Sequence, residues 1–168
     1  LEDQVNPKRC GHLDGKEVVP TELMLRRITA AVNERRDDQF VICARTDAAG
    51  VEGIDSAIER AKAYADAGAD LIFTEALHTP ADFEKFRAAV DVPLLANMTE
   101  FGKSELLSAK QLEDLGFNAV IYPVTTLRIA MGQVEEALAE IAATGTQTGW
   151  VDRMQHRSRL YELLRYNE

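Results

Sequence analysis

Four short apolar segments along the chain have the length and composition of buried β-strands. They are rich in β-branched, aromatic and other apolar residues and lack the polar alternation of a half-exposed strand. This pattern is typical of parallel strands that are covered on both faces. The four segments are residues 40–44, 70–73, 92–96 and 119–122.

Amphipathic helices are predicted between these strands. Apolar side chains recur at helical spacing over residues 21–35, and again from residue 54 to Gly68, the glycine that ends the second helix. Two more helices begin at capping sequences, one at Thr79 and one at Ser108. Strand and helix signals therefore alternate along this part of the chain.

Two further helices are predicted near the C-terminus, over about 126–143 and about 153–165. We expect the first of them to bury its apolar stripe. That stripe consists of Leu127, Met131, Val134, Leu138 and Ile141.

The spacing of the strands indicates the architecture. Successive strands begin roughly 22 to 30 residues apart, as in repeated βα units, and no linker or change in composition divides the chain. An open doubly wound sheet and a (β/α)8 barrel both fit this α/β pattern. A complete barrel needs about 250 residues, and residues 1–4 resemble the end of a strand. We therefore expect residues 1–168 to be one partial barrel domain, the C-terminal half with about four and a half βα units plus C-terminal helices, without the N-terminal strands.

Composition excludes several classes of protein. Of the 168 residues 46% are apolar, which is enough for a globular core, and the net charge of −9 argues against nucleic acid or an anionic membrane as a partner. No apolar run approaches the roughly 20 residues that span a bilayer, and the first ten residues are too polar for a signal peptide. Two cysteines cannot form a disulfide framework, so we expect a cytoplasmic protein.

Polar side chains follow every predicted strand. In both candidate folds the carboxyl ends of parallel strands gather the functional residues. Arg45, Glu75 and Asn97 each lie within a few residues of the last apolar position of a strand. A solvated loop is enough to account for Asp47, but not for a charge or an amide at the end of each strand. The pattern therefore predicts a shared site.

The same loops favour a carboxylate ligand over a phosphate. After the last two strands the sequence lacks the glycines that present backbone N–H groups to a phosphate in many barrels. Arg45, Arg128 and Arg157 each offer a guanidinium that pairs bidentately with a carboxylate, and Asn97 and Thr99 are neutral donors.

The most distinctive local chemistry lies in Lys8-Arg9-Cys10-Gly11-His12. Two cations and a histidine beside a thiol favour its thiolate form near neutral pH, and Gly11 allows close approach to a ligand. Three interpretations stay open for Cys10: a catalytic thiol, part of a metal site, or an incidental loop cysteine. Cys43, by contrast, has apolar neighbours and is predicted to be a buried core residue.

Residues 7–12 resemble the active-site loop of the isocitrate lyase and phosphoenolpyruvate mutase superfamily, and the KRCGH form is similar to that of the 2-methylisocitrate lyase family. The hexapeptide is fairly specific, and other motifs follow in matching order and spacing over essentially the whole chain. These motifs are Glu2-Asp3-Gln4, Ala44-Arg45-Thr46-Asp47, Val51-Glu52-Gly53, Ala96-Asn97-Met98-Thr99-Glu100-Phe101-Gly102, Tyr122-Pro123 and Met154-Gln155.

The resemblance implies a Mg²⁺-dependent barrel lyase that cleaves the tricarboxylate 2-methylisocitrate to pyruvate and succinate, in propionate breakdown by the methylcitrate cycle. It implies a homotetramer that exchanges C-terminal helices, with Cys10 as the proton donor. Glu2 would reach the metal through water, and the main metal-binding aspartates lie on strands outside this chain. The matched substrate-contacting residues are Cys10, Gly11, His12, Arg45, Glu75, Asn97, Met98, Thr99, Arg128 and Arg157.

Two alternative functions stay open. Within the superfamily, oxaloacetate-cleaving relatives can keep a similar loop. Isocitrate is also an alternative substrate, since it is one methyl group smaller and a methyl group is worth only about 1–3 kcal/mol in a pocket. Phosphonate enzymes generally lack the loop cysteine, so Cys10 argues against them. The other alternative is a non-catalytic half-barrel for assembly or regulation, which the missing aspartates favour and the polar strand ends oppose.

Overall fold

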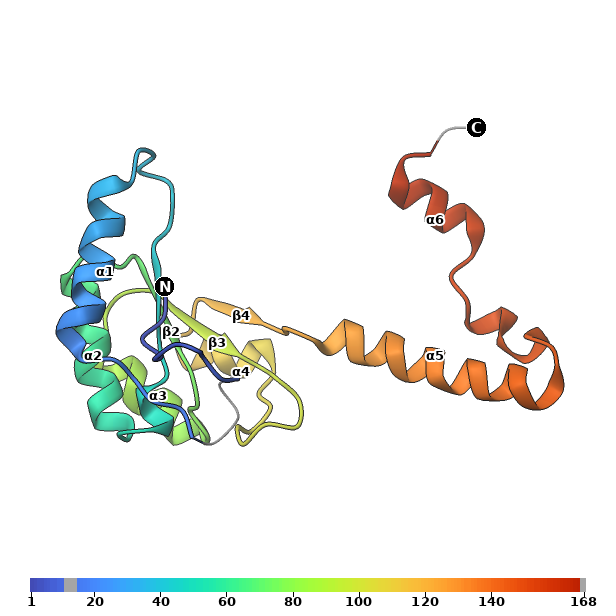
Figure 1. Ribbon diagram of the computed structural model, residues 1–168, viewed down its shortest axis with the longest axis horizontal. Helices are drawn as coiled ribbons and strands as arrows, with labels where there is room; N and C mark the ends of the chain where they lie inside the picture. The colour runs from blue at the N-terminus through green and yellow to red at the C-terminus, as the bar shows by residue number, and fades with distance from the viewer. Residues whose placement is uncertain (11–14, 167–168) are drawn as a thin grey trace. The chain divides into compact units, whose positions relative to one another are not determined.

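The computed structural model describes residues 1–10 and 15–166, which form two compact units, Leu1–Pro123 and Val124–Glu168 (Figure 1). The first unit alternates helices with strands, and the second is helical. In chain order the elements of the first unit are α1 (Thr21–Glu34), β1 (Cys43–Thr46), the 3-10 helix η1 (Ala48–Gly50), α2 (Ile54–Asp66), β2 (Leu71–Thr74), α3 (Pro80–Ala89), β3 (Leu94–Asn97), α4 (Ala109–Asp114) and β4 (Ala119–Ile121).

The four strands form one parallel sheet whose order, β1-β2-β3-β4, follows the chain. The first residues of the chain extend this sheet beyond β1. Glu2 forms a parallel bridge with Arg45, and the Arg45 amide donates to the carbonyl of Leu1 at 2.8 Å. The segment that resembled the end of a strand therefore runs parallel to β1. Among the strands that the structure describes, the order contains no reversal of the kind that defines a doubly wound sheet.

The two faces of the sheet are covered differently. On one face Ala44, Ile72 and Leu94 are fully buried, and α2 packs against β1 and β2, with α1 and α3 beside it on the same side (Figure 1). On the other face alternate side chains, such as those of Arg45 and Phe73, are only partly buried. We expected strands covered on both faces, whereas the described residues cover one.

Helix boundaries follow the local signals closely. Thr79 and Asp82 form a complete capping box at the start of α3, and Ser108 and Gln111 form another at the start of α4. The predicted starts of both helices are confirmed, because capping depends only on residues within one turn.

The first strand begins later than predicted. Phe40 and Val41 are 66% and 57% exposed, and β1 starts at Cys43. The backbone just before it is bound by a side chain, since the amide of Ile42 donates to the carboxylate of Asp70 at 2.8 Å. An apolar run therefore marked the strand but not its first residue.

Cys43 is half-buried, so its prediction as a core residue is wrong. Side chains alternate between the two faces of a strand. Cys43 therefore shares the open face with Arg45, whereas Ala44 between them points toward the helices. Partial burial still raises the pKa of the Cys43 thiol.

The second unit consists of α5 (Thr125–Thr144), η2 (Thr148–Arg153) and α6 (Arg157–Leu164). None of the α5 residues is buried, and the five side chains of its predicted apolar stripe are 39% to 61% exposed. The expectation of a buried stripe is therefore wrong for the part of the chain that the structure describes. The amphipathic pattern of residues 126–143 predicted the helix α5 correctly, but burial of its apolar side chains also requires another element that covers them.

Trp150 anchors the C-terminal end of α5. Its indole N–H donates to Glu140 at 2.7 Å, and the Arg153 guanidinium lies 3.9 Å from the ring centroid. The last helix begins at Arg157, later than predicted, because residues 148–153 form a 3-10 helix instead. Within the described ranges, no helix has both the length and the apolar character needed to cross a membrane.

Candidate functional site

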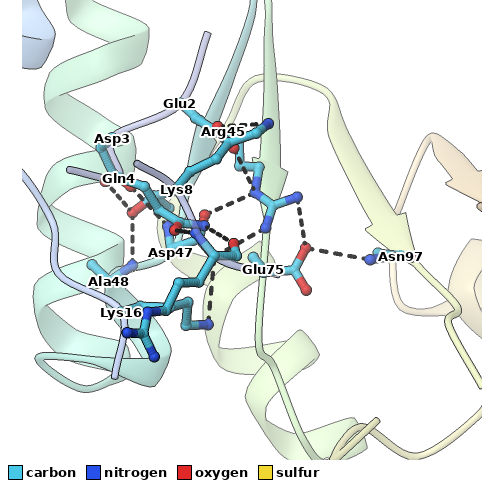
Figure 2. A network of polar contacts seen from close by, with 12 residues as sticks. Glu2, Asp3, Gln4, Lys8, Lys16, Arg45, Asp47, Ala48, Glu75 and Asn97 are labelled. Atoms are coloured by element: carbon cyan, nitrogen blue, oxygen red, sulfur yellow. Dashed lines mark hydrogen bonds and ion pairs between the residues drawn. The ribbon is translucent and has the colours of Figure 1, made fainter. Parts of the chain in front are cut away.

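Three neighbouring strands bring charged and amide side chains together at their carboxyl ends (Figure 2). Arg45 lies in β1, Glu75 follows β2 and Asn97 ends β3. Arg45 Nη1 is 3.3 Å from Glu75 Oε2, and Asn97 Nδ2 donates to the same oxygen at 3.3 Å. The structure thus groups three residues that the sequence placed at strand ends, and their contact with a substrate stays a prediction.

Carboxylates surround the Arg45 guanidinium. Nε and Nη2 donate to the two oxygens of Asp47 at 2.8 and 3.0 Å, Glu2 Oε2 is 3.6 Å from Nε, and the group lies 4.8 Å from the Phe73 ring centroid. Burial lowers the pKa of Arg45, but the Asp47 hydrogen bonds and the charges of Glu75, Asp47 and Glu2 outweigh burial and raise it. Arg45 is therefore a permanent cation at this edge of the sheet.

Asp47 is the fully buried partner of Arg45. Burial alone raises the pKa of its carboxyl, yet the hydrogen bonds and charge of Arg45, the charge of Lys16 and a hydrogen bond with Gln4 lower it overall. The Lys16 side chain, only 4% exposed, places Nζ 3.4 Å from Asp47 Oδ1. The sequence analysis treated Asp47 as an ordinary loop residue. Its position two residues after Arg45 was the signal that could have indicated the pairing of these two side chains.

Glu2 lies on the site side of the N-terminal segment. Its Oε1 is 2.8 Å from Lys8 Nζ, and its Oε2 faces Arg45. Lys8 therefore belongs to this network, although the sequence singled it out only as a cation near the thiol.

The described residues do not by themselves form a magnesium site. Among them no three His, Cys, Asp or Glu side chains are grouped as metal ligands require. Glu2 is one carboxylate whose two oxygens already face cations, and Mg²⁺ requires near-octahedral oxygen coordination. The present donor set therefore does not fit a complete metal centre.

Behind the site, Asp3 is fully buried and fixes the turn after β1. Its Oδ2 accepts hydrogen bonds from Thr46 Oγ1 at 2.7 Å and from the Tyr64 hydroxyl at 2.9 Å, and its Oδ1 accepts from the Asp47 amide at 2.9 Å. Burial raises the pKa of Asp3, and these hydrogen bonds together with the charge of Arg60 offset that rise only in part.

Tyr64→Phe is expected to lower the free energy of unfolding by about 1.5–3 kcal/mol, because it removes a buried hydroxyl that donates to a carboxylate. The Tyr64 bond lowers the pKa of Asp3, so its loss raises that pKa further. A folded-state pKa above the unfolded value costs stability as pH rises through the folded pKa. Urea denaturation of the full-length protein should therefore show a larger loss near pH 7 than near pH 4.

The matched control for this experiment is Tyr166→Phe, at a tyrosine that is 59% exposed. It should change the free energy of unfolding by less than about 0.5 kcal/mol. If Tyr64→Phe had the same effect at both pH values, ionised Asp3 would not be the group that Tyr64 stabilises.

Cys10 is exposed on a loop whose two ends are paired. Gln4 and Val18 form an antiparallel bridge at the base of this loop. The Gln4 side chain also binds both backbone groups of Arg9, donating to its carbonyl and accepting from its amide, each at 2.9 Å. The residue before Cys10 is therefore fixed by side-chain hydrogen bonds. Gly11, a predicted site residue, lies outside the described residues, as does His12.

A cavity of about 480 Å³ lies beside Arg45, which is within the size range of small-molecule sites. Its wall carries two cationic side chains, Lys8 and Arg45, and one carboxylate, Glu2, so the cations outnumber the anion. The cavity is lined by Leu1, Glu2, Lys8, Cys43, Arg45 and Phe73.

The other predicted site residues occupy different environments. Thr99 Oγ1 donates to Asn97 Oδ1 at 2.6 Å, which leaves the Asn97 N–H groups directed toward Glu75. The Met98 side chain packs in the core at 2% exposure. Arg128 lies in the first turn of α5 and Arg157 begins α6, both in the second unit, so their approach to Arg45 stays a prediction.

Comparison with known proteins identifies relatives along the whole chain. The family model described as phosphoenolpyruvate phosphomutase matches residues 1–142. A curated relative named "Probable 2-methylisocitrate lyase 2", from Corynebacterium glutamicum, is 86% identical over 168 residues, which are 100% of this chain and 55% of that protein. The chain thus spans about half the length of the curated relatives it matches.

Two solved structures have a fold similar to that of this chain. Oxaloacetate acetylhydrolase in complex with the inhibitor 3,3-difluorooxalacetate has a TM-score of 0.88 and 37% identity, covering 97% of this chain and 55% of that one. A phosphonopyruvate hydrolase complex with oxalate and Mg²⁺ has a TM-score of 0.81 and 29% identity, covering 98% and 57%.

Proposed function

This chain belongs to the phosphoenolpyruvate phosphomutase family, and from that premise we propose that the intact protein is a carbon–carbon lyase that cleaves 2-methylisocitrate to pyruvate and succinate. The observation that carries the proposal is the convergence of Arg45, Glu75 and Asn97 beside a cavity whose wall includes the cations of Lys8 and Arg45. The relative with 86% identity supports the substrate, because it is named for this activity.

The sheet is, in this proposal, part of a (β/α)8 barrel whose other strands lie outside this chain, and residues 1–168 belong to one catalytic domain. Strand order that follows the chain supports the barrel, as does the packing of helices on one face. The open face that carries Arg45 and Phe73 would then line the barrel interior, and the strand ends would form its catalytic edge.

The residues suit cleavage of a carbon–carbon bond beside a hydroxyl group. A base removes the hydroxyl proton, the oxygen becomes the pyruvate carbonyl, and the electrons of the broken bond remain on succinate as a carboxylate-stabilised carbanion. Arg45, Asn97 and Thr99 hold the negative charge that develops. Preorganised donors of this kind are often worth about 3 kcal/mol each in the transition state.

Cys10 completes the reaction by protonating that carbanion. Its S–H bond breaks, a C–H bond forms on succinate, and the sulfur is left as a thiolate. The side-chain hydrogen bonds of Gln4 to Arg9 support this role, since they fix the backbone beside the thiol.

Magnesium is the proposed cofactor of the intact protein. The structural neighbour that holds oxalate and Mg²⁺ supports this assignment. Glu2 is the described residue that would approach the ion, through water, and the remaining ligands would come from outside this chain. EDTA should therefore abolish activity of the full-length protein, and added Mg²⁺ should restore it.

A cytoplasmic homotetramer that exchanges C-terminal helices also belongs to the proposal. The apolar stripe of α5 supports a covering partner, because it is exposed in the single chain. Light scattering of the full-length protein gives the mass that tests the tetramer.

The deciding experiment offers 2-methylisocitrate, threo-isocitrate and oxaloacetate in parallel to the full-length protein. We expect kcat/KM for 2-methylisocitrate to exceed that for isocitrate by about 10-fold or more, as one methyl group in a pocket allows. Faster conversion of oxaloacetate would instead favour a second candidate function, the cleavage of oxaloacetate. The similarity to oxaloacetate acetylhydrolase supports this candidate. Turnover of none of the three would favour a non-catalytic module.

A further inference from the structure

The loop that carries Cys10 is attached at both of its ends to one carboxylate. At the start of the loop, Gln4 forms a hydrogen bond with the Asp47 side chain. At its end, Lys16 Nζ lies 3.4 Å from Asp47 Oδ1. Both attachments are buried, since Gln4 is 4% exposed and the Lys16 side chain is also 4% exposed. Burial shields these contacts from the screening that weakens surface ion pairs.

The same carboxylate holds the guanidinium of Arg45 (Figure 2). Arg45 donates to both Asp47 oxygens, at 2.8 and 3.0 Å. Asp47 is in turn fixed through its own amide, which donates to Asp3 Oδ1 at 2.9 Å. One fully buried side chain is therefore the common anchor of the cation and of the thiol loop.

We propose that Asp47, together with Lys16, is a positioning residue that sets the place of the Cys10 loop relative to a ligand on Arg45. This inference rests on the proposed function, in which Arg45 binds a carboxylate and Cys10 supplies a proton. Proton transfer requires the two heavy atoms to lie at hydrogen-bond distance. A misplacement of about 1 Å can lower a rate about 100-fold, so the position of Cys10 relative to Arg45 has a direct catalytic effect.

Gly50 provides a second way to disturb this link. A Cβ atom at residue 50 would lie 3.2 Å from Lys16 Nζ and 3.3 Å from the Cβ of Ala76. Gly50→Ala therefore requires the Lys16 ammonium, Ala76 or both to move by a few tenths of an ångström, while every charge is kept. Lys16→Met removes the charge but leaves Asp47 paired with Arg45, so the buried carboxylate keeps a cation.

The test compares these two variants of the full-length protein with matched controls. Lys62→Met changes a lysine whose side chain is 46% exposed, and Gly132→Ala adds a methyl group that meets nothing within 4 Å. We expect Lys16→Met to lower kcat for 2-methylisocitrate about 100-fold and Gly50→Ala about 10-fold. KM, succinate affinity and binding stoichiometry should change less than about threefold, because Arg45 and Asp47 are intact.

A second readout locates the thiol directly. Alkylation of Cys10 by iodoacetamide is followed by peptide mass spectrometry, with and without succinate. Bound succinate should slow alkylation in the wild type and in both controls, whereas Lys16→Met should bind succinate without this protection. A loss of folded protein would not mimic that result.

Three outcomes separate the hypotheses. Wild-type kcat and full protection in Lys16→Met would overturn the positioning role. If Lys16→Met does not fold, the test rests on Gly50→Ala. In that case a kcat of Gly50→Ala equal to that of Gly132→Ala would overturn the positioning role. A wild type that neither cleaves 2-methylisocitrate nor binds succinate would overturn the proposed function, and the positioning role with it.

Discussion

Cys10→Ser in the intact protein is expected to abolish cleavage of 2-methylisocitrate while succinate still binds. Serine has nearly the shape of cysteine, but its hydroxyl is a far weaker acid than a thiol near neutral pH. The carbanion would therefore form beside a group that cannot protonate it efficiently. Because a positioned general acid contributes about 10²–10⁴-fold, kcat should fall by about 10²–10⁴-fold.

Two measurements on the same variant separate catalysis from binding. Pyruvate release gives kcat, and calorimetric titration gives the affinity for succinate, which should stay within about threefold of the wild type if only the proton donor is lost. A near-normal rate in the serine variant would show that another group supplies the proton. Loss of succinate binding would instead show that Cys10 shapes the site.

Local patterns predicted the elements because the interactions that begin and end a helix are local. The capping boxes at Thr79 and Ser108 depend on side chains three residues apart, and both were predictable. Burial was harder to predict. Cys43 and the α5 stripe have apolar neighbours or helical periodicity, yet both are partly or largely exposed. Whether an apolar side chain is covered depends on a packing partner, which the local sequence does not contain.

The same distinction applies to the site. Arg45, Glu75 and Asn97 were predictable because parallel strands bring their carboxyl ends to one edge of the sheet. The contacts of Asp47 were not predictable, since Lys16 is 31 residues and Asp3 44 residues away in the chain. Those pairings follow from the return of the Cys10 loop and from the parallel approach of the N-terminal segment, which no periodic pattern records.

Arg45→Met is expected to cause the largest combined loss of stability and activity. It removes the cation that lies among Glu2, Asp47 and Glu75, of which Asp47 is 0% and Glu75 1% exposed. Removing one partner from a buried ion pair costs about 3–5 kcal/mol, because the remaining charge stays desolvated. Lys16 beside Asp47 offsets part of this cost, so about 3 kcal/mol is the expected loss in free energy of unfolding.

The pH dependence of that loss identifies its cause. Arg45 helps to hold the pKa of Asp47 below its ordinary value, so this pair stabilises the fold above the unfolded pKa and loses its effect as pH falls through the folded pKa. The stability difference between wild type and Arg45→Met should therefore be largest near pH 7 and shrink below about pH 4.

Two further variants isolate the role of the Arg45 guanidinium. Arg159→Met, at an arginine whose side chain is 54% exposed, is the matched control and should cost less than about 1 kcal/mol. Arg45→Lys keeps the charge but not the two parallel hydrogen bonds to Asp47, so it should recover stability more than activity. Equal recovery of both would mean that Arg45 acts at this site only as a positive charge, and the bidentate recognition of a substrate carboxylate would then be wrong.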